Sequence, residues 1–135
     1  MPSEACYCGQ AKIFYDGKPI RQGLCHCGEC KKYTSSAYSV NIIVSDEGWR
    51  TEGVFKSISK TADSGNIITT YFCPDCGSSM YRAGATFAGQ KVIQGGVIDG
   101  MTILNELKIE VELFAPQRLH WVPKVEGTPD KHDMN

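Results

Sequence analysis

Hydrophobic and polar residues alternate along much of this chain with the period of two that is typical of β-strands. The clearest example is residues 107–113, in which apolar side chains at the odd positions alternate with charged side chains at the even positions. This pattern predicts a strand with one buried face and one face in water. The buried face would carry Leu107, Ile109, Val111 and Leu113, and the face in water Lys108, Glu110 and Glu112.

Other apolar segments, most of them rich in Val, Ile and aromatic residues, predict further strands. They cover residues 11–15, 37–45, 54–59, 66–72 and 92–98. The segments 54–59 and 66–72 flank residues 62–65, which predicts a hairpin with a loop of several residues. Gly95 and Gly96 interrupt the last segment and indicate a bulge or a close approach of the backbone.

Helical patterns are rare, and we predict only short helical turns at residues 29–33 and 101–105. A chain of 135 residues has the size of one domain. We therefore predict a single, mainly β domain with little helix over residues 1–123. The polar tail at residues 124–135 is expected to be frayed.

Composition and charge argue against two classes of partner. No apolar run approaches the roughly 20 residues needed to cross a bilayer, so we expect no membrane partner. Lys and Arg number 14 against 15 Asp and Glu, which gives a formal net charge of -1, and no block of basic residues is present. Electrostatic binding to nucleic acid is therefore not expected.

All seven cysteines fall into three short clusters. They are Cys6 and Cys8, then Cys25, Cys27 and Cys30, and finally Cys73 and Cys76. A disulfide framework is one explanation, but an odd number of cysteines leaves one thiol unpaired. The N-terminal residues contain no readable secretory signal, so we expect a cytoplasmic protein whose thiols stay reduced. Cysteine clusters in that setting favour metal binding.

The outer clusters together suit one closed metal site. Cys73, Cys76 and Gly77 have the form of a zinc knuckle, in which two thiolates reach one ion across a tight turn that glycine accommodates. Two cysteines cannot complete a tetrahedral shell, so this pair would share its zinc with Cys6 and Cys8. Metal binding would then tie the N-terminal segment to the central hairpin and contribute directly to folding.

The middle cluster supplies three thiolates within six residues and leaves a fourth position for water or a substrate thiol. Catalytic zinc is usually held in this way, so we predict that Cys25, Cys27 and Cys30 are the catalytic residues. Two alternatives stay open. His26 completes a closed shell, although its position between two ligands tends to direct its side chain away; or the middle cluster pairs with a member of the first cluster.

Longer motifs surround these cysteines. They read Cys6-Tyr7-Cys8-Gly9, Cys25-His26-Cys27 followed by Cys30-Lys31-Lys32, and Phe72-Cys73-Pro74-Asp75-Cys76-Gly77-Ser78, with weaker support from Gly96-Val97-Ile98-Asp99, Phe114 and Trp121. In this order and spacing, from about Cys6 to Trp121, the chain resembles the glutathione-dependent formaldehyde-activating enzyme family. That family also includes the domain of centromere protein V.

The resemblance implies a small zinc-stapled β fold similar to that of the mammalian suppressor of Sec, with two zinc ions per chain. The structural zinc would be held by Cys6, Cys8, Cys73 and Cys76, and the catalytic zinc by Cys25, Cys27 and Cys30. The implied activity is that of a carbon–sulfur lyase of the S-hydroxymethylglutathione synthase type, which joins glutathione and formaldehyde reversibly. A small thiol adduct of formaldehyde or of another carbonyl compound is the expected partner.

The residues around the cysteines bear on the substrate. Lys31, Lys32 and Arg82 are candidate partners for the two carboxylates of glutathione. Lys31 stands where the family often carries arginine and lacks its bidentate fork, and Ser35 stands where a glycine is expected. These departures do not affect the expected metal ligands, but they leave the identity of the substrate undetermined. Trp121 is expected to serve in packing. A non-catalytic zinc-binding interaction module and a glutathione carrier are the alternatives to an enzyme.

Overall fold

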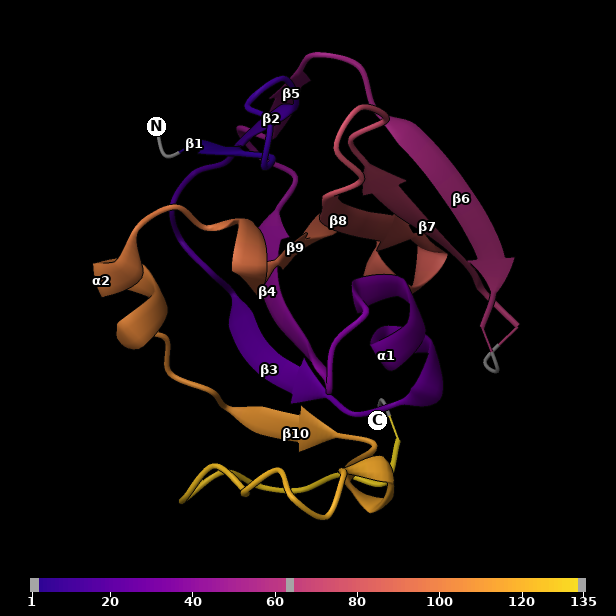
Figure 1. Ribbon diagram of the computed structural model, residues 1–135, viewed down its shortest axis with the longest axis vertical. Coiled ribbons are helices and arrows are strands. Elements are labelled where there is room, and N and C mark those ends of the chain that lie inside the picture. Colours follow the sequence, from indigo (N-terminus) through magenta and orange to yellow (C-terminus); the bar gives the residue numbers. More distant parts are fainter. Residues whose placement is uncertain (1–2, 63–64, 134–135) are drawn as a thin grey trace.

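Two β-sheets form the framework of the molecule (Figure 1). The computed structural model describes residues 3–62 and 65–133. In these ranges a three-stranded sheet contains, in spatial order, β1 (Ser3–Ala5), β2 (Lys12–Phe14) and β5 (Arg50–Glu52). A seven-stranded sheet contains, in spatial order, β10 (Val111–Leu113), β3 (Arg21–Cys25), β4 (Ser39–Ser45), β9 (Gln90–Gln94), β8 (Ser79–Gly84), β7 (Ile67–Phe72) and β6 (Lys56–Thr61). The predicted mainly β fold is confirmed.

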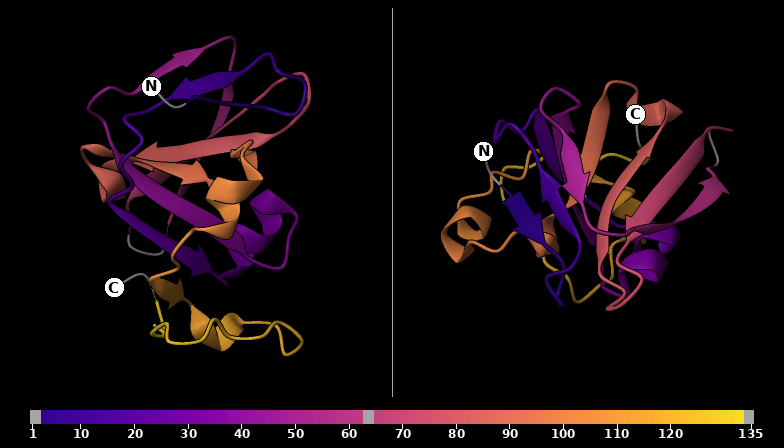
Figure 2. Two further views of the ribbon diagram at one scale, coloured as in Figure 1. Left: turned by 90° about the vertical axis from the view of Figure 1, so that its left-hand side faces the viewer. Right: turned by 90° about the horizontal axis from the view of Figure 1, so that it is seen from above.

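Neighbouring strands of the larger sheet run antiparallel, except that β10 runs parallel to β3. The predicted hairpin is confirmed, because β6 pairs with β7 from Lys56 opposite Phe72 to Thr61 opposite Ile67. The predicted strand at 37–45 is confirmed as β4. The further views show a twisted and curved sheet rather than a flat one (Figure 2).

Helices are short in the described part of the chain. They are α1 (Gly28–Thr34), α2 (Met101–Asn105) and the 3-10 turns Ala85–Phe87, Gly95–Val97 and Ala115–Gln117. Both predicted helical turns are present. Among the described residues, no helix has the length and apolar character that a membrane span requires.

The hydrophobic core joins the two sheets. Ile13 of β2 is fully buried in the same cluster as Ile42 and Val44 of β4 and Ile93 of β9. Aromatic rings extend this cluster, because the ring of Tyr81 stacks on Tyr71 and meets Trp49 edge-on. The core therefore fixes the smaller sheet, and with it the segment that carries Cys6 and Cys8, against the larger sheet.

The predicted strand at 92–98 is shorter than expected, because β9 ends at Gln94 and a 3-10 turn follows. The close backbone approach expected at the two glycines is confirmed at Gly95. A Cβ atom built on Gly95 would lie 2.5 Å from Cγ1 of Val40, whereas one built on Gly96 would meet nothing within 4 Å. Gly95 is needed because β4 passes directly against it.

We expect Gly95→Ala to lower the free energy of unfolding by about 1–3 kcal/mol, because the new methyl group overpacks against Val40. Gly96→Ala is the matched control and should change stability little, since its methyl group has open space. Urea unfolding of both variants measures the difference. Equal losses in the two variants would show that the contact with Val40 is not the cause.

Three expectations for the C-terminal part are wrong. The strand predicted at 107–113 is present only as β10, Val111–Leu113. Glu112, assigned to the face in water, is fully buried. The tail is not frayed over residues 124–131, because Glu112 accepts a backbone hydrogen bond from Lys131 and donates one to Pro129, and the buried Thr128 donates to the carbonyl of Ile109. The tail covers the side of β10 that alternation alone would leave in water.

Candidate functional site

The outer cysteine clusters meet in one group. Cys6 and Cys8 follow β1, and Cys73 and Cys76 lie in the turn between β7 and β8. The four Sγ atoms lie within 4.8 Å of one another, with 3.6 Å between Cys6 and Cys8 and 3.7 Å between Cys8 and Cys73. We call this group the four-cysteine centre.

Tight turns position these thiols. Gly77 has φ +77°, the backbone geometry expected for the knuckle, and its N–H donates to the carbonyl of Cys73. The N–H of Ala11 donates to Sγ of Cys6 at 3.2 Å. Hydrogen bonds from the side chain and backbone of Ser78 lower the pKa of Cys76 to about 5. These hydrogen bonds therefore favour a thiolate at Cys76.

The sulfur geometry fits zinc. Four thiolates at the usual Zn–S distance of about 2.3 Å in a tetrahedron have their sulfurs about 3.8 Å apart. The observed separations of 3.6 and 3.7 Å are close to this value, and all seven cysteines are free thiols rather than disulfides. The donor set and its spacing suit a closed structural metal site.

The middle cysteines form a second group, the three-cysteine centre. Cys25 ends β3, Cys27 caps the start of α1 and Cys30 lies in its first turn, and their Sγ atoms lie within 4.8 Å of one another. Cys25 and Cys30 are buried and Cys27 is half-buried. Hydrogen bonds from Cys25 and Cys30 lower the pKa of Cys27 to about 2. The helix start thus gathers three thiols with a thiolate at the more accessible position.

His26 joins neither cysteine group. Its fully buried ring turns to β10, where Nε2 lies 2.9 Å from Oε1 of Glu112. The other carboxylate oxygen of Glu112 accepts from the N–H of Val125 at 3.0 Å and lies 3.2 Å from the guanidinium of Arg118. Arg118 pairs in turn with Asp130 at 2.6 Å. His26 therefore anchors the cysteine loop to the C-terminal segment. The alternation of residues 107–113 did not predict this contact, because it placed Glu112 on the face in water.

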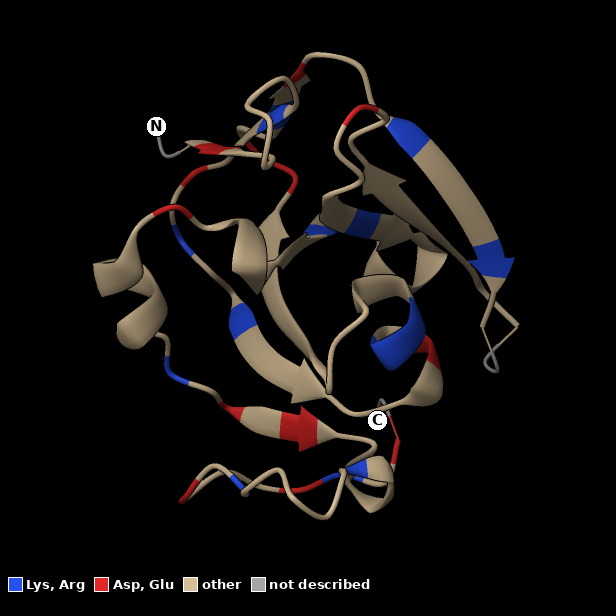
Figure 3. Ribbon diagram, viewed as in Figure 1, with Lys and Arg blue, Asp and Glu red and all other residues tan. Residues whose placement is uncertain are grey.

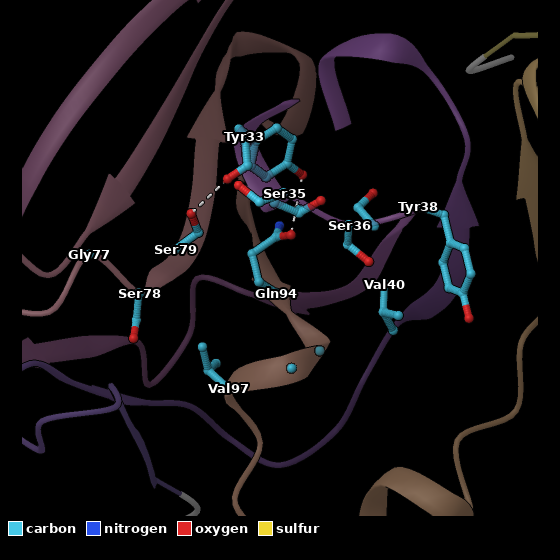
Figure 4. A pocket seen from close by; sticks show the side chains of 14 residues that line it. Tyr33, Ser35, Ser36, Tyr38, Val40, Gly77, Ser78, Ser79, Gln94 and Val97 are labelled. Carbon is cyan, nitrogen blue, oxygen red and sulfur yellow. Dashed lines mark hydrogen bonds between the residues drawn. The ribbon is translucent and has the colours of Figure 1, made fainter. Parts of the chain in front are cut away.

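Figure 4 shows the side chains that line a cleft, whose volume is about 390 Å³. No cysteine lines it, but the hydroxyl of its lining residue Ser78 lies 3.3 Å from Sγ of Cys76. The cleft is lined by residues 33–36, 38–40, 77–79 and 94–97. Ser39 lies opposite Cys25 in the β3–β4 register, and Ser78 is two residues beyond Cys76. Most side chains labelled in Figure 4 end in hydroxyl or amide groups, and Tyr33 donates to Gln94 at 3.2 Å. We call this space the hydroxyl-rich cavity.

The three cationic candidates do not line the hydroxyl-rich cavity. Lys31 donates to the carbonyl of Gln117, and the guanidinium of Arg82 lies over the ring of Tyr33, 4.2 Å from its centroid. Lys32 is exposed on α1. Lys and Arg residues are spread over separate elements of the ribbon (Figure 3).

Ser35 ends α1 with φ +54°, a left-handed conformation that glycine adopts without strain. The glycine expected at this position from the resemblance therefore has a physical reason, and serine here adds a hydroxyl group to the cavity wall.

The cysteine motifs and their geometry agree with a comparison to protein families. Residues 1–117 match the family described as glutathione-dependent formaldehyde-activating enzyme. The chain belongs to this family. The family's name indicates glutathione-dependent activation of formaldehyde, and thus chemistry on thiol adducts.

A solved structure resembles the fold of this family member. It is a crystal structure of a Rhodobacter sphaeroides protein, with a TM-score of 0.61 and 12% sequence identity over 80% of this chain and 97% of that one. At this identity the likeness concerns the fold alone. No curated protein matched this chain.

Trp121, which was expected to pack, is 74% exposed, so that expectation is wrong. Trp121 is one of the residues on which the family resemblance rests. In the described structure it belongs neither to a cysteine centre nor to the wall of the hydroxyl-rich cavity.

Proposed function

We propose that this protein is a zinc-dependent carbon–sulfur lyase that forms and cleaves adducts between glutathione, or a related thiol, and a carbonyl compound. The observation that carries the proposal is a group of three thiols, two of them buried and Cys27 half-buried, beside a hydroxyl-rich cavity, in a member of the formaldehyde-activating family. The catalytic residues are Cys25, Cys27 and Cys30. A second zinc, at Cys6, Cys8, Cys73 and Cys76, is structural.

In the reaction the thiol adds across the carbonyl double bond. A sulfur–carbon bond forms, the thiol proton ends on the carbonyl oxygen, and the reverse step cleaves the same bonds. Zinc, when bound, would supply a site for the substrate sulfur as thiolate and polarise the carbonyl oxygen. The half-burial of Cys27 leaves an approach for the substrate, and the buried Cys25 and Cys30 exclude water from the other side of the centre.

The cavity orients the substrate. Hydroxyl groups of Ser36, Ser39 and Ser78 line it and offer hydrogen bonds to peptide groups and to a developing alkoxide. Thiolate centres require reduced cysteines, so we place the protein in the cytoplasm, with a small molecule as its partner.

Cys27→Ser tests the catalytic role. We expect its metal content to fall from two zinc ions to one, and turnover to fall at least tenfold, because the accessible ligand of the three-cysteine centre is lost while the structural centre remains. Metal analysis and exchange NMR of the glutathione–formaldehyde equilibrium measure the two quantities.

The control for this experiment is Tyr7→Ala, because Tyr7 is 94% exposed and also lies between two cysteines. It should keep both metal ions and full turnover. If Cys27→Ser lost one zinc and kept full turnover, the catalytic assignment would be wrong.

Calorimetry with glutathione separates the two remaining alternatives. Saturable binding without any acceleration of adduct exchange would identify a carrier. Absence of both binding and acceleration would identify a non-catalytic zinc module.

A further inference from the structure

A second cavity, of about 300 Å³, continues the hydroxyl-rich cavity. The two share Tyr38, Val40, Gly95 and Gly96, so together they form one cleft. The remaining wall of the second cavity is aliphatic and consists of Leu24, Leu104, Leu107, Ile109 and Val125. We call this part the apolar cavity.

The apolar cavity is built from four separate parts of the fold. Leu24 of β3 lies opposite Val40 of β4, α2 contributes Leu104, and the C-terminal segment contributes Val125. Leu104 and Leu107 also pack on the hydrophobic core. The position of the aliphatic wall is therefore set by the core and by the docked tail.

Formaldehyde does not account for this cleft. Its adduct adds one carbon and one hydroxyl group to the thiol, whereas the apolar cavity alone has about 300 Å³, and a water molecule occupies about 30 Å³ of liquid. A hydroxymethyl group would leave aliphatic walls facing water, which costs free energy that an apolar substrate group would recover.

The lack of charged residues along the cleft also favours an apolar substrate group. Among the described residues that line either cavity, none is Lys, Arg, Asp or Glu. A charged tail on the carbonyl compound would lose its hydration in the apolar cavity without gaining a partner. The hydroxyl-rich cavity beside the three-cysteine centre suits the polar thiol-bearing part instead.

We propose that the carbonyl partner of this protein is an apolar aldehyde, whose alkyl or aryl tail occupies the apolar cavity while the thiol-bearing part occupies the hydroxyl-rich cavity. The inference rests on the proposed function and names the substrate class of that same site. Addition of the thiol joins sulfur to the aldehyde carbon and moves the thiol proton to the aldehyde oxygen, so the step needs no oxidant or reductant.

A series of aldehydes tests the proposal. Formaldehyde, propanal, butanal, pentanal and hexanal are each equilibrated with glutathione, and exchange NMR gives kcat/KM above the uncatalysed rate. We expect kcat/KM to rise by up to about fourfold per added methylene, the factor that corresponds to burying one CH₂ group. Catalysis of formaldehyde exchange with no dependence on chain length would overturn this inference and leave the proposed function standing.

Variants locate the effect. Leu104→Ala should lower kcat/KM for hexanal about tenfold more than it lowers kcat/KM for formaldehyde. Ile103→Ala, the neighbouring exposed residue of α2, is the matched control and should change neither. Because Leu104 also packs on the core, Gly96→Leu gives a second variant that removes no packing. The leucine side chain should narrow the junction between the two cavities, and kcat/KM should therefore fall more for hexanal than for formaldehyde.

Binding of an unreactive analogue gives a readout that is independent of turnover. We expect calorimetry to give at least tenfold tighter binding of S-hexylglutathione than of S-methylglutathione, and Gly96→Leu to remove the difference. If no aldehyde were turned over and this preference persisted, the catalytic proposal would fail while the apolar cavity would still be assigned to the tail. Equal affinities for the two analogues would reject the assignment.

Discussion

Cys73→Ser is expected to leave the chain without a stable fold. Cys73 is fully buried, belongs to the hydrophobic core and lies within the four-cysteine group that links the N-terminal segment to the β7–β8 turn. Structural zinc contributes about 10–16 kcal/mol to the folding of small zinc domains. That contribution is as large as the whole stability of a typical domain, about 5–15 kcal/mol. Loss of the zinc proposed for this centre would therefore outweigh the stability that the rest of the core supplies.

Circular dichroism, thermal unfolding and metal analysis measure this effect. Cys27→Ser is the matched control, because it removes one thiol from the other centre, and it should keep a cooperative transition and one zinc ion. A strong chelator added to the unchanged protein should reproduce the effect of Cys73→Ser. A cooperative transition at an unchanged temperature in Cys73→Ser would contradict a structural role for this centre.

The grouping of the cysteine thiols within each motif was predictable because it depends on short spacings. Two cysteines separated by one or two residues, with a glycine next to the pair, already determine that their thiols face the same point. The hairpin of β6 and β7 was predictable for a similar reason, since its strands and loop are adjacent in the sequence. The first and last cysteine clusters are 65 residues apart. Their pairing was predicted from the number of ligands, because two cysteines alone cannot complete a tetrahedral zinc site.

The C-terminal part was predicted poorly because tertiary contacts override its pattern. Alternation placed Glu112 in water, and only the contact with His26 and the return of the tail to β10 make that position buried. No local rule links residue 26 to residue 112. The exposure of Trp121 has the same origin, because a large apolar residue predicts packing only where the fold provides a neighbour.

The residues that line the cleft could not be predicted from the sequence either. Their charge alone makes Lys31 and Arg82 candidates for binding anions. In the fold, however, Lys31 donates to the carbonyl of Gln117, and the guanidinium of Arg82 lies over the ring of Tyr33. The aliphatic wall comes from segments that are far apart in the chain. Substrate identity depends on this assembly, so the shape of the cleft could not be predicted from the motifs, whereas the grouping of the cysteines could.

Glu112→Ala is expected to lower the free energy of unfolding by about 3–5 kcal/mol, the cost of removing one partner from a buried ion pair. The two oxygens of Glu112 serve His26, Arg118 and the N–H of Val125. Its removal leaves the fully buried imidazole of His26 with neither nitrogen hydrogen-bonded, since Nδ1 already lacks a partner. The docked tail loses its central acceptor at the same time.

Urea unfolding of three variants separates the causes. Glu112→Gln keeps the volume and one acceptor oxygen, so it should lose less stability than Glu112→Ala. Glu110→Ala is the matched control two residues away on the exposed side of the segment, and it should stay within about 0.5 kcal/mol of the unchanged protein. Because His26 lies between Cys25 and Cys27, Glu112→Ala should also speed the loss of the zinc proposed for the three-cysteine centre. An unchanged unfolding midpoint in Glu112→Ala would mean that the tail and the cysteine loop are held together by other contacts.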